Sequence, residues 1–355
     1  MLKTSKELTN ETVTLISKFK SGELKPIPTG IEHLDEALLG GLLPGSVLGI
    51  VGRSGHGKSY DMERIQRHIL NTQPDVIYMN ANWELSHFKL LVRDISFRTE
   101  KSVKTVLFEP LNEESTKELK DICDLHRTDN VYYQNEPVTS DVFTEDVMGL
   151  ITKFPDSKIV VAIDNLENIL LDKGSQKECM DRLLYKINIL KNLHSYISFI
   201  ILNQMNREYI YEINNIKHHR PHEGHIYGSD QFYKICDVVY IKLIPAKLGI
   251  KDKFMIFGVN QYNWLEEHKT DEGANTTSFD PFGRAFYFYV KQRQPEDEKN
   301  IKDIFVEVMY TKEETDEPIN KKPKSNPMPD FTKGLPTPTL DEAFGSDNTN
   351  DDPPF

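Results

Sequence analysis

Short apolar segments recur along this chain of 355 residues, and stretches with helical patterning separate several of them. The segments are rich in β-branched and aromatic residues, as buried strands are. Strands that alternate with helices pair in parallel, and uninterrupted apolar strands are covered on both faces. The chain is therefore predicted to be an α/β protein with a mostly parallel central sheet flanked by helices. The segments are VLGIVG, DVIYMN, VYYQN, KIVVAID, ISFIILNQ, DVVYIKLI, FMIFGVN, AFYFYVKQR and IFVEVMY.

The predicted sheet belongs to a domain that we expect to span residues 27–312. Residues 1–26 contain Val13, Ile16 and Phe19 at helical spacing, which predicts an amphipathic helix. The polar stretch 262–283 is expected to be a long loop. The prolines, lysines and acidic residues of 313–355 cannot form a core, so we expect a disordered acidic tail there.

The composition excludes several classes of protein. Three cysteines stand far apart without the spacing of a disulfide or zinc framework. No apolar run reaches the ~18 residues of a membrane-spanning helix, and the N-terminus lacks the features of a secretory signal. We therefore expect a cytoplasmic protein without a membrane partner. A formal net charge of −12 means that any contact with nucleic acid must be local.

The octapeptide GRSGHGKS at 52–59 lies between a predicted strand and a predicted helix. It meets the pattern G-x-x-x-x-G-K-[ST] at every fixed position. The glycines allow the backbone to curl so that successive N–H groups point at phosphate oxygens, which the positive end of the following helix also attracts. ATP is thus the expected ligand of the loop. Its residues are Gly52, Arg53, Ser54, Gly55, His56, Gly57, Lys58 and Ser59.

Catalysis at such a loop needs further polar groups. Lys58 would reach the β and γ phosphates, and Ser59 would hold Mg²⁺. Asp164 ends a predicted buried strand, where a ligand of the same metal is expected, although an aspartate there could also cap a helix. Glu84 and Gln204 follow two other predicted strands. Glu84 is a candidate base for water and Gln204 a candidate γ-phosphate sensor, but each could equally be an ordinary loop residue.

The order of these motifs resembles the RecA-like motor domain of the DnaB-type replicative helicases, over roughly residues 27–312. The resemblance implies that Glu84 is the catalytic base and Asp164 the metal aspartate, with Arg93 on the helix after Glu84. The matching segments are PIPTGIEHLDEALLGGLLPGSVLGIVGRSGHGKS, NANWELSHFKLLVRDIS, VVAIDNLENIL, ILNQMNRE, HRPHEGHIYGSDQFYKICDVVYI and YVKQRQ.

The resemblance also implies an assembly. YVKQRQ is similar to the segment with which members of the family reach the neighbouring subunit's nucleotide, so Lys291 and Arg293 are candidate catalytic residues in trans. Without the resemblance they would be solvated basic residues at a strand end. The implied partners are further copies of the chain, in a hexameric ring around single-stranded DNA. The family's N-terminal primase-docking domain is not expected in this sequence, which leaves the first helix as the linker and suggests phage-type replication in a bacterial host.

Basic residues near the expected pore are the candidates for binding DNA. Lys217 and Arg220 flank two histidines in NNIKHHRPH, and Arg207 lies in the Gln-x-x-Arg-like motif. A ring needs few such residues, since several subunits present copies to one phosphate backbone. The alternative is an exposed polar loop without a ligand.

Two points stay open from the residues alone. The ending DDPPF resembles the partner-docking tip of bacterial single-stranded DNA-binding proteins, so it could bind replisome proteins, or it could be a tail without a partner. The function could also be that of a RecA- or RadA-like recombination ATPase, or of a nucleotide-gated DNA-binding or loading factor without unwinding.

Overall fold

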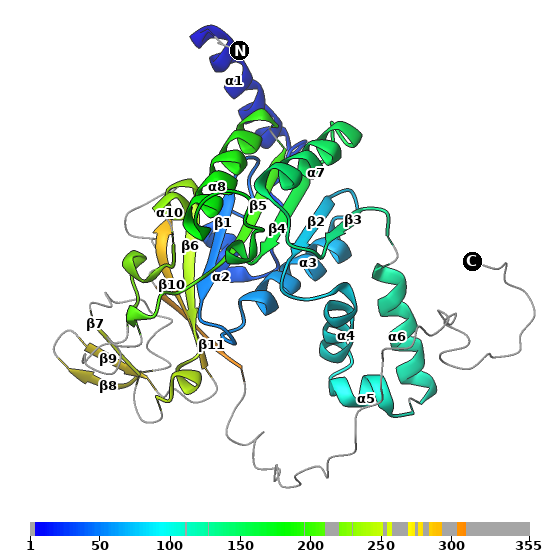
Figure 1. Ribbon diagram of the computed structural model, residues 1–355, viewed down its shortest axis with the longest axis vertical. Coiled ribbons are helices and arrows are strands. Elements are labelled where there is room, and N and C mark those ends of the chain that lie inside the picture. Colours follow the sequence, from blue (N-terminus) through cyan, green and yellow to red (C-terminus); the bar gives the residue numbers. More distant parts are fainter. Residues whose placement is uncertain are drawn as a thin grey trace, which may run out of the picture.

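The centre of the molecule is an eight-stranded sheet (Figure 1). Its strands lie in the order β11-β10-β6-β1-β5-β4-β2-β3, and every neighbouring pair from β6 to β3 is parallel. β10 and β11 extend the sheet in antiparallel pairing. The prediction of a mostly parallel sheet is therefore confirmed. The strands are β1 Val47–Gly52, β2 Ile77–Asn82, β3 Val131–Gln134, β4 Ile159–Asp164, β5 Ile197–Gln204, β6 Val238–Leu243, β10 Arg284–Gln292 and β11 Ile304–Val308.

The computed structural model describes most of the predicted domain. The described residues are 4–110, 112–126, 128–194, 196–209, 220–228, 230–250, 254–257, 269–273, 276–279, 284–292 and 304–309. The predicted tail 313–355 lies outside them, as do Lys217 and Arg293. The helices are α1 Ser5–Ser21, α2 Glu32–Ala37, α3 Lys58–Thr72, α4 His87–Arg98, α5 Val103–Phe108, α6 Glu113–His126, α7 Ser140–Lys153, α8 Gln176–Leu193 and α10 Asp230–Ile235, with 3-10 turns η1 Leu166–Asn168, η2 Glu223–His225 and η3 Pro245–Leu248.

Helices cover both faces of the sheet, and each face has its own apolar core. On one face the sheet packs against α7, α8 and α10, and on the other against α2 and α3. β1 serves both cores because its side chains alternate. Val47 and Val51 belong to the first core, whereas Leu48 and Ile50 belong to the second. A strand that is buried on both faces must be apolar throughout, which explains the uninterrupted apolar segments of the sequence.

A smaller group of helices lies to one side of the sheet. α4, α5 and α6 lie together there, and Ile95, Leu119 and Ile122 form a separate apolar cluster among them (Figure 1). None of the helices in the described part of the chain combines the length and the apolar character that a membrane crossing requires.

The N-terminal helix is present and projects away from the body of the molecule (Figure 1). Thr4 and Glu7 form a reciprocal capping box at its start, and Gly22 ends it with a left-handed φ of 75°. No residue of α1 is buried, and Val13 and Ile16 are 55% and 48% exposed. The predicted helix is therefore confirmed. Val13 and Ile16 stay exposed on it, whereas Phe19 is half-buried beside Leu38 of the domain.

The prediction of a long loop at 262–283 is wrong in part. Two strands, β8 Lys269–Gly273 and β9 Thr276–Phe279, form a hairpin there. β9 also pairs with β7 Phe254–Phe257, which completes a three-stranded antiparallel sheet. Antiparallel strands are held by backbone hydrogen bonds and need no uninterrupted apolar run, so this hairpin lacks the pattern that marks the main strands.

Two isoleucines of α8 test the core that α8 forms with the sheet. Ile187 is completely buried, whereas Ile189 on the same helix is 40% exposed. We expect Ile187→Ala to lower the free energy of unfolding by about 2–5 kcal/mol, because it removes buried methyl groups and leaves a cavity. Ile189→Ala should change it by less than about 0.5 kcal/mol. Denaturant unfolding of the two variants measures this, and equal losses would contradict the packing described.

Candidate nucleotide site

The loop that was predicted to bind phosphate lies at the edge of the sheet where the parallel strands end. It joins β1 to α3, which begins at Lys58. Gly55 and Gly57 have φ values of 80° and 86°, in the left-handed region that favours glycine. A Cβ on Gly52 would lie 2.8 Å from the carbonyl oxygen of Lys242. The glycines therefore let the loop curl under the N-terminus of α3, where backbone N–H groups attract anions.

Lys58 is held inside the curl of this loop. Its Nζ donates hydrogen bonds to the carbonyl oxygens of Gly52, at 2.8 Å, and Arg53, at 3.3 Å. Burial lowers the pKa of Lys58, and the charges of Asp164 and Glu84 act against that shift. A partly desolvated ammonium group is thus directed at the mouth of the loop.

Asp164 lies at the end of β4, directly beside the loop, and is 1% exposed. Nδ2 of Asn82 donates to Oδ2 of Asp164 at 3.3 Å, while Oδ1 has no hydrogen-bond partner among the described residues. Burial raises the pKa of Asp164, and Ser59 and Lys58 oppose the rise. A buried carboxylate oxygen without a partner is unfavourable unless a cation binds it. The carboxylate oxygens of Asp164 fit Mg²⁺, which binds oxygen ligands of this kind.

Glu84 follows β2 on the same edge and is exposed. Asn165 donates to its Oε2 from Nδ2 at 3.4 Å. Oδ1 of Asn82 accepts the backbone N–H groups of Glu84 and Leu85, at 3.2 and 2.7 Å. Asn82 therefore connects the turn that carries Glu84 to the buried Asp164. Neither asparagine was predicted from the sequence, although each stands directly at the end of a strand or just after it.

A cavity of about 330 Å³ opens in front of these groups. Gln204 reaches it from the end of β5, where it is paired in register with Gly52. Arg93 of α4 also reaches it and lies 3.3 Å from Oε1 of Glu63, whose pKa burial raises to about 7. The lining residues are Ser54, Gly55, Gly57, Lys58, Ser59, Tyr60, Glu84, Arg93, Gln204 and Lys247. The predicted residues thus converge on one cavity that is rich in polar groups.

A second cavity, of about 260 Å³, lies against α1 and has a different character. Its lining is mostly apolar and includes Leu15, Phe19 and Leu38. Asp237, which also lines it, accepts the N–H of Val47 at 2.8 Å and so fixes the start of β1. This cavity offers little to a phosphate, and the polar cavity at the loop is the candidate site.

His56 anchors the loop to the end of β6. It is 2% exposed, and its Nδ1 accepts the backbone N–H of Ile244 at 2.9 Å. Burial lowers the pKa of His56 to about 4, and Lys247 and Lys58 add to the shift. The imidazole is therefore neutral at physiological pH and acts as a hydrogen-bond acceptor. The glycine-rich pattern of the loop did not predict that His56 would have this structural role.

Other predicted site residues are not among those that line the cavity. Lys291 of β10 is paired in register with Val239, near the start of β6, so it lies toward the opposite edge of the sheet from the loop. Its Nζ donates to the carbonyl oxygen of Lys234 at 3.3 Å. Arg207 is exposed just after β5, and Arg220 is half-buried at the start of a described segment. Within one subunit, Lys291 therefore cannot reach the loop.

Comparisons with known proteins identify the family and the fold of the chain. The family model described as the DnaB-like helicase C terminal domain matches residues 26–248, well over half of the chain. The chain belongs to this family. A search of the curated proteins by sequence gave no match.

Solved structures of the family share the fold. The ATPase domain of G40P aligns with a TM-score of 0.62 at 13% identity, over 81% of this chain and 91% of that one. A DnaB-like replicative helicase, whose interactions with primase were studied, aligns with a TM-score of 0.59 at 13% identity, over 80% of this chain and 61% of that one. The chain thus has the RecA-like ATPase fold of these helicases.

The buried histidine of the loop gives a pH-dependent prediction. The pKa of His56 is about 4 in the folded protein, against an ordinary value of 6.5. Between these values the unfolded chain binds a proton that the folded chain does not, so His56 makes stability fall as the pH drops. His56→Gln keeps an acceptor for the N–H of Ile244 and removes the titration. Between about pH 7 and about pH 4, the free energy of unfolding should therefore fall by roughly 3 kcal/mol less in the variant than in the wild type.

Denaturant unfolding of both proteins across this pH range measures that difference. If the free energy of unfolding changed with pH equally in the wild type and the variant, His56 would not be buried in its neutral form.

Proposed function

We propose that this protein is the ATP-driven motor of a replicative DNA helicase and acts as a hexameric ring on single-stranded DNA, in phage-type replication. The observation that carries the proposal is the convergence of Lys58, Ser59, Glu84 and Gln204 on one cavity beside the buried Asp164. Family membership supports helicase function. The proposed place of action is the cytoplasm, that of a bacterial host if the gene is carried by a phage.

Several residues at the cavity have a proposed part in hydrolysis. The loop from Gly52 to Ser59 binds the phosphates through its N–H groups, and Lys58 neutralises the β and γ phosphates. Ser59 and Asp164 would hold Mg²⁺, which when bound offsets the charge that develops on the phosphate oxygens. Oδ1 of Asp164, which lacks a hydrogen-bond partner within the described part of the chain, supports this assignment.

Glu84 is the proposed base. Its carboxylate is exposed at the cavity, where it can orient a water molecule and accept its proton. Asn165 contacts Oε2, and Asn82 holds the backbone of the turn. Gln204 lies at the cavity, at the end of β5. It is placed to sense the γ-phosphate, and a shift of its side chain would move the segment that follows. That segment contains Arg207.

The remaining catalytic groups are proposed to come from a neighbouring subunit. Lys291 lies too far along the sheet to act on its own loop, which supports a role in trans, together with Arg293. The exposed apolar residues of α1 are consistent with a linker helix that packs on the adjacent subunit.

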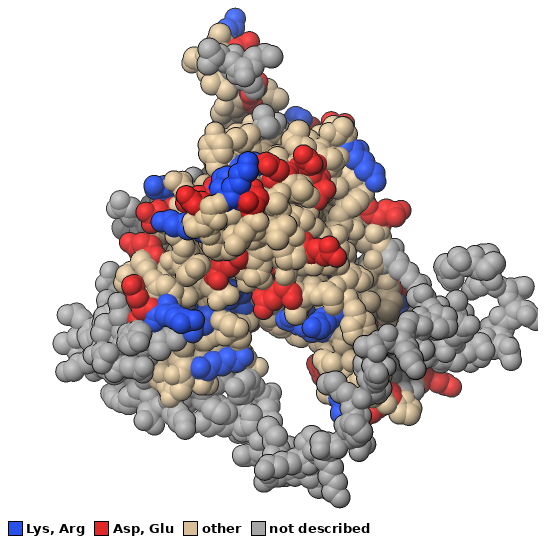
Figure 2. Space-filling model, viewed as in Figure 1, with Lys and Arg blue, Asp and Glu red and all other residues tan. Residues whose placement is uncertain are grey.

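DNA is proposed to contact Arg207, Lys217 and Arg220. Figure 2 shows acidic and basic side chains interspersed over the visible face, without one large basic patch. On this face, the distribution supports a local contact that is repeated by the subunits of a ring. The alternative functions are a recombination ATPase and a loading factor without unwinding. Glu84 in the cavity favours hydrolysis but does not decide among them.

Two substitutions separate nucleotide binding from hydrolysis. Glu84→Gln removes the base but no phosphate contact, so we expect ATP binding to remain and ATPase activity to fall about a hundredfold or more. Lys58→Ala removes a phosphate contact and should abolish both ATPase activity and fork unwinding. Glu118→Gln, at an exposed glutamate of α6, is the matched control.

The measurements are ATPase rates with and without single-stranded DNA, and unwinding of a forked substrate by the assembled oligomer. An oligomer whose ATPase rate DNA does not stimulate and that does not unwind the fork would refute the helicase proposal. DNA-stimulated hydrolysis without unwinding would favour the recombination ATPase.

A mixing experiment tests the action in trans. Lys58→Ala lacks the loop lysine but keeps Lys291, and Lys291→Met has the opposite defect. We expect each variant alone to be inactive and the mixture to recover part of the ATPase activity, because some interfaces combine an intact loop with an intact Lys291. No recovery, in oligomers shown to contain both variants, would argue against the trans assignment.

A further inference from the structure

The end of β6 and the turn η3 that follows it run alongside the phosphate loop. The Lys242 ammonium pairs with Asp61 of α3, the N–H of Ile244 donates to His56, and Nζ of Lys247 donates to the carbonyl oxygen of Gly55. One short segment of chain thus contacts the middle of the loop and the first turn of the helix that the loop precedes.

The strongest of these contacts is an ion pair that is buried on both sides. Nζ of Lys242 lies 2.5 Å from Oδ1 of Asp61, and the two side chains are 3% and 0% exposed. The hydroxyl of Tyr240 donates to Oδ2 of Asp61 at 2.9 Å. The ammonium group also lies 4.8 Å from the centre of the Tyr287 ring. Both charges therefore have partners, as buried charges require.

Lys242 also touches the two ends of the loop. It is paired in register with Gly52, and a Cβ on Gly52 would lie 2.8 Å from its carbonyl oxygen. A Cβ on Gly57 would lie 3.3 Å from its Nζ. The backbone of Lys242 thus packs against the entry of the loop and its side chain against the exit.

Stability alone does not account for this pair. Replacing a buried ion pair with apolar residues of similar volume is often neutral or stabilising. Lys242 and Asp61 are absent from the lining of the nucleotide cavity, so neither is placed to touch a phosphate. What the pair does fix is the distance between β6 and the first turn of α3, and therefore the curvature of the loop between Gly52 and Gly57.

We propose that Lys242, through its ion pair with Asp61, is a positioning residue that holds the phosphate loop in the shape that binds anions. This inference rests on the nucleotide site of the proposed function. It adds that affinity for nucleotide depends on a charge pair behind the loop that makes no contact with the ligand. Loss of the pair would leave every phosphate-binding group present but less well placed.

The test compares Lys242→Met, Asp61→Asn and the double variant in the full chain. A non-hydrolysable fluorescent ATP analogue with Mg²⁺ reports the Kd, and thermal unfolding reports the Tm. Each single variant leaves one buried charge without its partner, so both Tm and affinity should fall, the affinity by about tenfold or more. The double variant removes both charges. It should recover Tm but keep the weakened Kd, and its ATPase should show a raised KM with kcat nearly unchanged.

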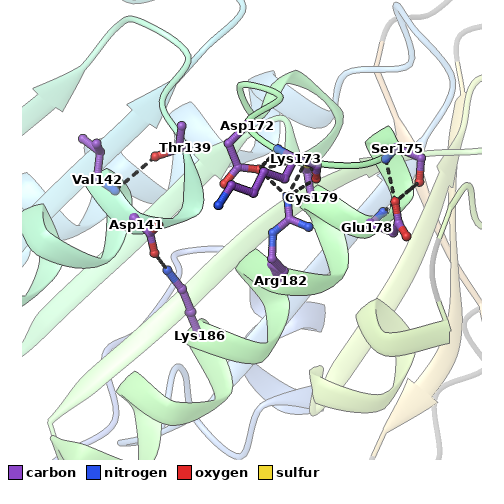
Figure 3. Close-up of polar contacts among 10 residues, drawn as sticks. All are labelled: Thr139, Asp141, Val142, Asp172, Lys173, Ser175, Glu178, Cys179, Arg182 and Lys186. Carbon is purple, nitrogen blue, oxygen red and sulfur yellow. Dashed lines mark hydrogen bonds and ion pairs between the residues drawn. The ribbon is translucent and has the colours of Figure 1, made fainter.

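The control for loss of a Lys–Asp contact elsewhere in the chain is Lys186→Met. Lys186 pairs with Asp141 between α8 and α7, in a Lys–Asp contact that lies outside the nucleotide cavity (Figure 3). This variant should bind the analogue as the wild type does.

Two results would refute the positioning role of Lys242, and a third would refute the nucleotide site itself. If the double variant regains both Tm and wild-type Kd, or if the single variants bind normally, the pair has no positioning role and the inference is wrong. If the single variants do not fold, the double variant decides alone, by its Kd. If the wild type binds no analogue, the proposed nucleotide site itself is refuted.

Discussion

Parallel pairing of the central strands is the constraint on which the rest of this structure depends. Parallel strands all end at the same edge of a sheet, so the residues that follow β1, β2, β4 and β5 meet there although they are far apart in the sequence. These residues lie at the end of such a strand or just after it, and they are the loop at Gly52–Ser59, Glu84, Asp164 and Gln204. Had any strand run in the opposite direction, its polar residue would lie at the other edge, as Lys291 does on the antiparallel β10.

Several charged side chains are buried around α3. Lys58, Asp61 and Glu63 lie within its first two turns, and each is buried. Their partners come from different elements, since Lys242 is on β6 and Arg93 on α4. Such pairs gain little net stability because desolvation offsets the attraction, but a buried charge without its partner is strongly unfavourable. They therefore fix which elements must lie next to the helix, and with them the position of the loop.

Family membership and the site support different parts of the functional conclusion. The family model covers residues 26–248 and identifies a helicase domain, while structures at 13% identity show the shared fold. Neither establishes the role of a residue. Those roles rest on chemistry in this chain. One example is the Asp164 oxygen that has no hydrogen-bond partner among the described residues, and another is the contacts of the two asparagines with Asp164 and Glu84.

The sequence by itself determined the fold class, the strands of the main sheet and the phosphate loop, because these follow from local patterns. An apolar β-branched run marks a buried strand, and a glycine-rich loop between strand and helix has few other uses. The sequence did not reveal the hairpin β8–β9, because its polar strands carry no apolar run. Only the tertiary structure revealed the parts played by Asn82, His56 and the Lys242–Asp61 pair. Asp61 and Lys242 are 181 positions apart, and nothing in either local pattern shows that folding brings the two charges together behind the loop.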